Sequence, residues 1–139
     1  MADQVQKLGL REGQLICLLQ APAAASHKRL AILPSSVIIH TTLEAFNYDL
    51  ILVWPLHLEG LAQFFTRSQV DLQPAGVIWA VMPKQKYARQ RGIDYNWDQL
   101  QAAALTTDLV DNKTASFSEQ DYATRFVIRK KRRTTVMKR

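Results

Sequence analysis

The side chain best suited to acid–base chemistry is His57, because histidine changes its charge near neutral pH. It closes the stretch Trp54-Pro55-Leu56-His57, directly after an apolar run that predicts a buried strand. The sequence identifies no partner that would orient its ring. His57 is therefore the one catalytic candidate, and a role at the surface or at the entry of a helix stays open beside it.

Cys17, the single cysteine, lies within the apolar run LICLL. A free cysteine in such a run is ordinarily a small buried hydrophobe, and the sequence places no base nearby that would make it a nucleophile. The histidines His27, His40 and His57 share no close spacing with Cys, Asp or Glu of the kind that metal sites show. We therefore predict no bound metal.

One cysteine cannot form a disulfide framework, which agrees with a reducing compartment. The first residues, MADQVQKLGLREG, lack the apolar centre of a signal peptide. No apolar run approaches the roughly 20 residues that are needed to cross a bilayer. These observations predict a cytoplasmic protein that does not contact a membrane.

A basic stretch, PKQKYARQRG, covers residues 83–92 and surrounds one aromatic residue, Tyr87. Its basic side chains are those of Lys84, Lys86, Arg89 and Arg91. Cations around a stacking ring are typical of contacts with an anion or with nucleic acid. A solvated loop without a ligand is the alternative.

The C-terminal stretch Arg129–Arg139, RKKRRTTVMKR, holds seven of the 18 basic residues, and the rest of the chain is nearly neutral. Such a stretch binds phosphates without sequence preference. The candidate contacts are Arg129, Lys130, Lys131, Arg132 and Arg133. A solvated end of the chain is the alternative. The net charge of +6 therefore supports nucleic-acid binding only through this one tail.

Three runs are apolar along their whole length, which is typical of strands covered on both faces of a parallel sheet. They span residues 14–19, 48–54 and 77–82, and a shorter β-branched strand is expected at 37–40. Helices are expected at 23–33, 58–71 and 97–109, and Pro74-Ala75-Gly76 is expected to break the chain before the third run.

The last elements differ from the first, because alternating polar and apolar residues indicate an antiparallel hairpin over 113–118 and 122–129. The predicted fold class is α/β, a three-layer, doubly wound, mostly parallel sheet with a C-terminal antiparallel hairpin. The 139 residues suit one domain. We expect it to span 1–130, followed by a basic tail at 131–139.

Four short stretches carry a resemblance to a known family. They are KLGLREG at 7–13, VMPK at 81–84, VDNK at 110–113 and YATRF at 122–126. The chain resembles a family of short bacterial proteins of uncharacterised activity, whose fold is a truncated, degenerate Rossmann-type fold like that of S-adenosylmethionine-dependent methyltransferases. The resemblance covers about residues 7–130 and implies a fold without an activity. Tyr122 departs from the tryptophan expected there.

The methyltransferase-like fold implies a glycine-rich turn after the first strand, where the backbone approaches the cofactor closely. This chain has Gln20, Pro22 and Ala24 in the glycine positions, and Leu18 or Leu19 where an acid is expected. Proline removes an N–H donor, and alanine adds a Cβ where φ is positive.

The carboxylate that holds the ribose at the end of the second strand is also missing. His40-Thr41-Thr42 stand there, and Glu44 is the nearest acid. We therefore expect no cofactor and no ordinary binding of S-adenosylmethionine.

The fold still leaves a crevice at the carboxyl ends of the parallel strands. The residues predicted to line it are Gln20, Pro22, Glu44, Pro55, His57, Pro83 and Lys84. The sequence favours a non-catalytic binding or regulatory module that contacts a macromolecule or an anionic ligand. A small atypical methyltransferase that uses His57 or Lys84 stays open, as does nucleic-acid binding through the tail. A second copy of the chain that covers an apolar edge strand also stays open.

Overall fold

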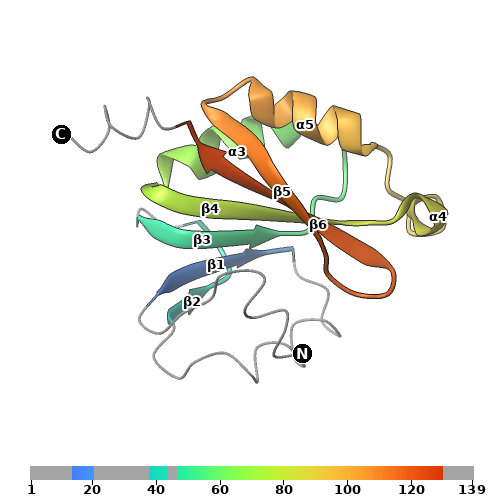
Figure 1. Cartoon of the computed structure of the whole chain (residues 1–139), viewed down its shortest axis with the longest axis horizontal. Helices are drawn as coiled ribbons and strands as arrows, with labels where there is room; N and C mark the ends of the chain where they lie inside the picture. The colour runs from blue at the N-terminus through green and yellow to red at the C-terminus, as the bar shows by residue number, and fades with distance from the viewer. Residues whose placement is uncertain (1–13, 21–37, 44–46, 130–139) are drawn as a thin grey trace.

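The structure is a computed structural model of the whole chain, and it describes residues 14–20, 38–43 and 47–129 (Figure 1). The expected helix at 23–33 lies outside these residues. The same holds for Pro22, Ala24 and Glu44 among the candidate site residues, and for the tail beyond Arg129.

Six strands form one mixed sheet in the order β2-β1-β3-β4-β6-β5. The strands are β1 (Leu15–Leu19), β2 (Ile38–His40), β3 (Tyr48–Val53), β4 (Leu72–Pro83), β5 (Leu109–Ser116) and β6 (Asp121–Ile128). Strands β1 to β4 run parallel to one another, and β6 lies antiparallel to both β4 and β5. The expected parallel sheet with an antiparallel C-terminal hairpin is therefore confirmed.

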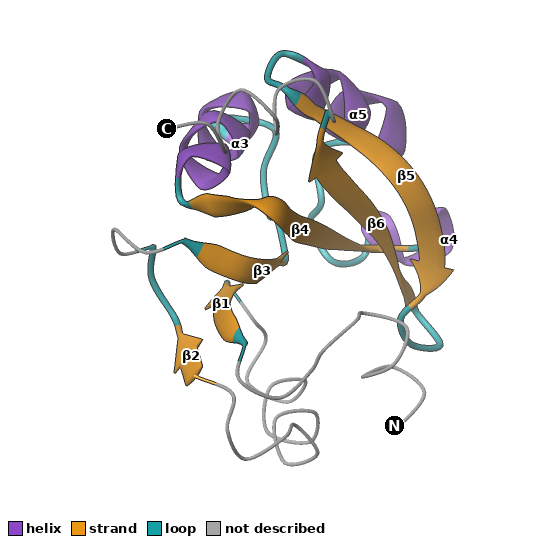
Figure 2. Ribbon diagram, turned by 60° about the vertical axis from the view of Figure 1, so that its left-hand side comes forward, coloured by secondary structure: helices purple, strands orange, loops and turns teal. Residues whose placement is uncertain are grey.

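The described helices are α3 (Leu61–Val70), the single-turn α4 (Gln85–Ala88) and α5 (Trp97–Leu105). Figure 2 shows α3 and α5 side by side on one face of the sheet. The second helical layer expected of a doubly wound sheet would come from 23–33, outside the described residues.

The helix expected at 97–109 ends early, at Leu105. The Thr106 and Thr107 hydroxyls donate to the carbonyls of Ala103 and Ala104, which satisfies the last turn. The chain then enters β5 at Leu109, four residues before the strand that the sequence predicts. The hairpin is therefore longer than expected, and the helix is shorter.

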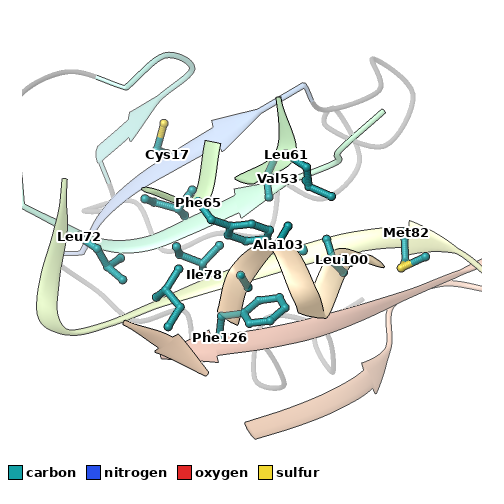
Figure 3. Close-up of a cluster of buried hydrophobic side chains, with 14 of the residues drawn as sticks. Cys17, Val53, Leu61, Phe65, Leu72, Ile78, Met82, Leu100, Ala103 and Phe126 are labelled. Carbon is teal, nitrogen blue, oxygen red and sulfur yellow. The ribbon is translucent and has the colours of Figure 1, made fainter. Parts of the chain in front are cut away.

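The main core lies between the sheet and the two helices (Figure 3). The rings of Phe65 on α3 and Phe126 on β6 have centroids 5.2 Å apart, so this core joins the parallel and antiparallel parts of the sheet. Cys17 is fully buried there, as expected of a small hydrophobe. A second cluster, on the other face, contains Trp54 and Trp79. Burial of both clusters confirms that these strands are covered on both faces.

The prediction of a break at Pro74-Ala75-Gly76 is wrong, because these residues lie inside β4. The pairing of β3 with β4 does shift its register between Tyr48 and Leu50, so the proline and glycine fall in an irregular part of the strand. A Cβ on Gly76 would lie 2.8 Å from the Tyr48 carbonyl oxygen. Glycine is thus required here because another backbone approaches closely.

None of the described helices is both long enough and apolar enough to cross a membrane.

Candidate functional site

Two adjoining hollows lie at the carboxyl ends of β1 and β3, and together we call them the strand-end crevice. They have volumes of about 120 and 360 Å³ and share the lining residues Gln20, Val53 and Phe64. The smaller is also lined by Pro55, Leu56, His57, Glu59, Gly60 and Leu61. The larger is also lined by Leu19, Thr42, Leu43 and Arg67.

Gln20, the first residue after β1, adopts a left-handed backbone with φ of 61°. It is the one non-glycine residue of the described part of the chain with a positive φ. Glycine adopts this conformation without strain, whereas other residues pay a steric cost. The resemblance places a glycine at this turn, so the turn conformation is present although the glycine is not.

The carboxyl end of β2 carries an imidazole where the fold family implies an acid. His40 Nδ1 and the Tyr48 hydroxyl are 2.8 Å apart, and the hydroxyl lies 3.2 Å from the Thr42 carbonyl oxygen. The two rings also meet edge to face, with centroids 5.6 Å apart. These contacts tie His40 to the start of β3, and no carboxylate of residues 38–43 stands at this strand end.

His57 has a neighbour that the sequence did not reveal. Its Nδ1 lies 3.6 Å from Asp94 Oδ2, and both side chains are largely exposed. The other carboxylate oxygen of Asp94 accepts a hydrogen bond of 2.7 Å from the Leu58 N–H. The expectation that His57 has no partner is therefore wrong, because a loop 37 residues further along the chain folds back onto it.

Tyr95 holds the segment that precedes His57 in place. Its hydroxyl donates a buried hydrogen bond of 2.7 Å to the Pro55 carbonyl oxygen. Burial raises the pKa of Tyr95, and the neighbouring Tyr122 and Asp94 raise it further. Sequence reasoning missed both Asp94 and Tyr95. The available signal was the spacing of Ile93, Tyr95 and Trp97, which places a bulky residue at every second position after the basic stretch 83–92.

A separate hollow of about 360 Å³ lies between the end of β4, α4 and the start of α5. We call it the aromatic hollow. Its lining residues are Met82, Pro83, Gln85, Ala88, Tyr95, Asn96, Trp97, Asp98 and Tyr122. None of them lines the strand-end crevice. Pro83, predicted as a crevice residue, therefore lies in this second hollow.

The basic side chains of 84–91 do not converge on one point. Lys84 Nζ donates to the Glu119 carbonyl oxygen over 2.8 Å, so it points to the β5–β6 turn and does not line the crevice. Arg91 pairs with Asp121 on the same hairpin. These contacts attach the segment around α4 to the hairpin, which accounts for two of the five anion contacts predicted in this loop.

The remaining predicted contacts of this loop are Lys86, Tyr87 and Arg89. Lys86 Nζ lies over the Tyr87 ring, 5.5 Å from its centroid, and both Lys86 and Arg89 are exposed. Arg129 is exposed just after β6, where its backbone N–H donates to the Asp108 carbonyl oxygen. Lys130, Lys131, Arg132 and Arg133 lie outside the described residues.

Within 14–20, 38–43 and 47–129, no group of three His, Cys, Asp or Glu side chains is arranged to hold a metal ion.

Comparison with solved structures places the chain beside methyltransferases. A TehB-like S-adenosylmethionine-dependent methyltransferase from Corynebacterium glutamicum superposes with a TM-score of 0.59 at 11% identity, over 92% of this chain and 86% of that protein. The CcbJ methyltransferase from Streptomyces caelestis gives a TM-score of 0.59 at 9% identity, over 91% of this chain and 93% of that protein.

An O-methyltransferase family 2 protein from Planctomyces limnophilus, solved in complex with apigenin, gives a TM-score of 0.62 at 10% identity, over 84% of this chain and 50% of its own. No family model matches the chain, and no curated protein matches its sequence. At such low identity the similarity establishes the fold alone. The chain has a Rossmann-like fold of the methyltransferase type.

Proposed function

We propose that this chain is a non-catalytic binding or regulatory module, which does not bind S-adenosylmethionine in the ordinary way and takes an anionic ligand in the strand-end crevice. Membership in the family of short bacterial methyltransferase-like proteins is part of the same proposal. The observation that carries it is the carboxyl end of β2, where His40 is bonded to the Tyr48 hydroxyl. Among the residues that the structure describes, no carboxylate lies there to bind a ribose.

The charge that lines the larger hollow supports an anion, and the one acid of the crevice lining, Glu59, belongs to the smaller hollow. Arg67, on the last turn of α3, is the one ionised side chain in the lining of the larger hollow. Thr42 and Gln20 line the same hollow and supply a hydroxyl and an amide. A guanidinium with neutral donors beside it suits a carboxylate or a phosphate. A sulfonium cation such as that of S-adenosylmethionine is repelled by Arg67.

Thermal unfolding of the full chain with added ligands tests the proposal. A ligand present at ten times its Kd stabilises a protein by about 1.4 kcal/mol, which gives a measurable rise in Tm. We expect no rise with S-adenosylmethionine or S-adenosylhomocysteine, and a rise with inorganic pyrophosphate that Arg67→Gln abolishes. Lys113→Gln, an exposed charge on the far edge strand β5, is the matched control. A rise with either adenosyl compound contradicts the proposal.

A second candidate function is a small atypical methyltransferase, and one specific observation favours it. Asp94 lies close enough to His57 to orient its ring, as the carboxylate partner of a general base does. If the chain transfers methyl groups with His57 as the base, His57→Ala abolishes turnover and leaves the unfolding midpoint unchanged. Full activity in that variant eliminates this candidate.

A further inference from the structure

The aromatic hollow has the composition of a site for a positively charged organic group. Three of its lining residues are aromatic, namely Tyr95, Trp97 and Tyr122, and they come from the α5 entry and from β6. Met82 and Pro83 form the apolar end of β4 in the same lining. The faces of aromatic rings carry partial negative charge, so several rings around one space attract a cation.

Hydrogen bonds fix two of the three rings. The Tyr95 hydroxyl donates to the Pro55 carbonyl oxygen over 2.7 Å, and Trp97 Nε1 donates to Thr124 Oγ1 over 2.9 Å. Each ring is thus anchored by its polar end. Both rings also pack against the main core, and only part of each lines the hollow. A site whose side chains are already held in place loses less conformational entropy when a ligand binds.

Tyr122 is the third ring, and its hydroxyl lies at the wall of the hollow near that of Tyr95. The residue is half-buried on β6, two positions before the Thr124 that anchors Trp97. Within the described part of the chain, the Tyr122 hydroxyl makes no hydrogen bond. A half-buried hydroxyl at the wall of a hollow, with no hydrogen-bond partner among the described residues, is a natural contact for a polar group on a ligand.

The charges at the hollow also favour a cation. Asp98, in the first turn of α5, is the one ionised side chain in the lining. Lys84 and Arg91 bind the β5–β6 hairpin and Lys86 lies over Tyr87. The Arg91 charge still acts on Tyr95, but more weakly than the Asp94 carboxylate does.

The positive end of the α5 dipole opposes a cation, but it amounts to about half a unit charge. The α5 capping box already occupies part of that end, because Asn96 accepts a hydrogen bond from the Gln99 N–H. The full charge of the Asp98 carboxylate is therefore the larger effect.

We propose that the aromatic hollow binds a small organic cation, such as a methylated ammonium group, against Tyr95, Trp97 and Tyr122, with Asp98 as the counter-charge. This binding does not depend on the strand-end crevice, because the two sites share no lining residue.

The test is a titration of the full chain with choline, in which the NMR signal of the Trp97 indole N–H is measured at each choline concentration. The control ligand is 3,3-dimethylbutan-1-ol, which has the shape of choline and no charge. We expect a saturable shift with choline, and binding of the neutral alcohol that is weaker by about tenfold, as a desolvated cation–π contact implies. Equal affinity for the two ligands, or no saturable shift with choline, overturns the proposal.

Variants show whether the site is the one proposed. Asp98→Asn is an exposed, near-isosteric change, and it lowers choline affinity by about threefold if this carboxylate is the counter-charge. Glu119→Gln removes an exposed carboxylate on the β5–β6 turn, outside the hollow, and leaves choline affinity unchanged. An affinity that Asp98→Asn does not change, or that falls equally in the two variants, contradicts the assignment.

Discussion

The strand-end crevice and the aromatic hollow lie at the carboxyl ends of neighbouring strands, yet their walls are built differently. His57 and Asp94, at the rim of the crevice, are largely exposed, and their contact is a loose 3.6 Å. The rings of Tyr95 and Trp97 are each held by a hydrogen bond of 2.9 Å or less. Substitutions in the hollow should therefore cost folding energy, whereas substitutions at the crevice should cost little.

The largest effect is expected for Tyr95→Phe. The change removes the buried hydrogen bond to Pro55 and leaves that carbonyl oxygen without its donor. A buried polar group left unpaired costs about 1–3 kcal/mol. We predict a loss of about 2 kcal/mol in the unfolding free energy, measured by urea denaturation. A loss below about 0.5 kcal/mol would contradict the statement that this bond holds the ring.

Tyr95 also affects how the unfolding free energy depends on alkaline pH. Burial raises the pKa of Tyr95 above 10.0 in the folded chain and also raises that of Tyr122. The folded state thus holds these protons more tightly than the unfolded state, so their contribution is complete below about pH 10 and is lost as the pH rises further. We predict that stability falls above about pH 10, and that it falls less steeply in Tyr95→Phe. Parallel curves for the two proteins would contradict this.

Asn96→Ala is expected to have the next largest effect. The Asn96 side chain accepts from the Gln99 N–H, and the Gln99 side chain accepts from the Asn96 N–H, so the pair closes the start of α5 beneath the hollow. Loss of such a cap costs about 1 kcal/mol. Chemical denaturation measures it, and Gln99→Ala, which removes only half of the capping box, should cost less. The reverse order would be evidence against the cap.

Gln20→Gly is a change at the crevice with the opposite sign. Gln20 has a φ of 61°, and glycine adopts that backbone without strain. Because glycine also increases the entropy of the unfolded chain, the net gain is about 0.5 kcal/mol. Thermal unfolding measures the gain. A loss of more than about 1 kcal/mol would mean that the Gln20 side chain supports the crevice.

The smallest effect is expected for His57→Ala. The His57 side chain is 66% exposed and its neighbour Asp94 is 56% exposed, and exposed ion pairs contribute about 0–1 kcal/mol. We predict a change of less than about 0.5 kcal/mol in unfolding free energy, measured beside Tyr95→Phe under the same conditions. A larger loss would place His57 among the residues that hold the fold.

The contrast between the two sites also explains what the sequence revealed. Uninterrupted apolar runs at 48–54 and 77–82 indicated the parallel strands, since burial on both faces leaves a clear pattern. The capping box of α5 joins Asn96 and Gln99, which are three positions apart, so it too is a local pattern of the sequence. Local patterns thus predicted most of the described elements.

Contacts between distant residues could not be read in the same way. The approach of Asp94 to His57 and the bond from Tyr95 to Pro55 join segments 37 and 40 residues apart. Pro83 was assigned to the crevice because it follows a strand, but α4 and α5 enclose a second hollow around it. The sequence therefore did not predict the aromatic hollow, because only the fold brings Tyr95, Trp97 and Tyr122 together.

The most direct test of the proposed crevice is a ¹⁵N-NMR titration of the full chain with S-adenosylhomocysteine. We predict no saturable shift at Gln20, Val53 or Phe64, which line both parts of the crevice, up to millimolar ligand. Saturable shifts confined to these residues, with a micromolar Kd, would contradict the claim that the fold is present without its ordinary cofactor.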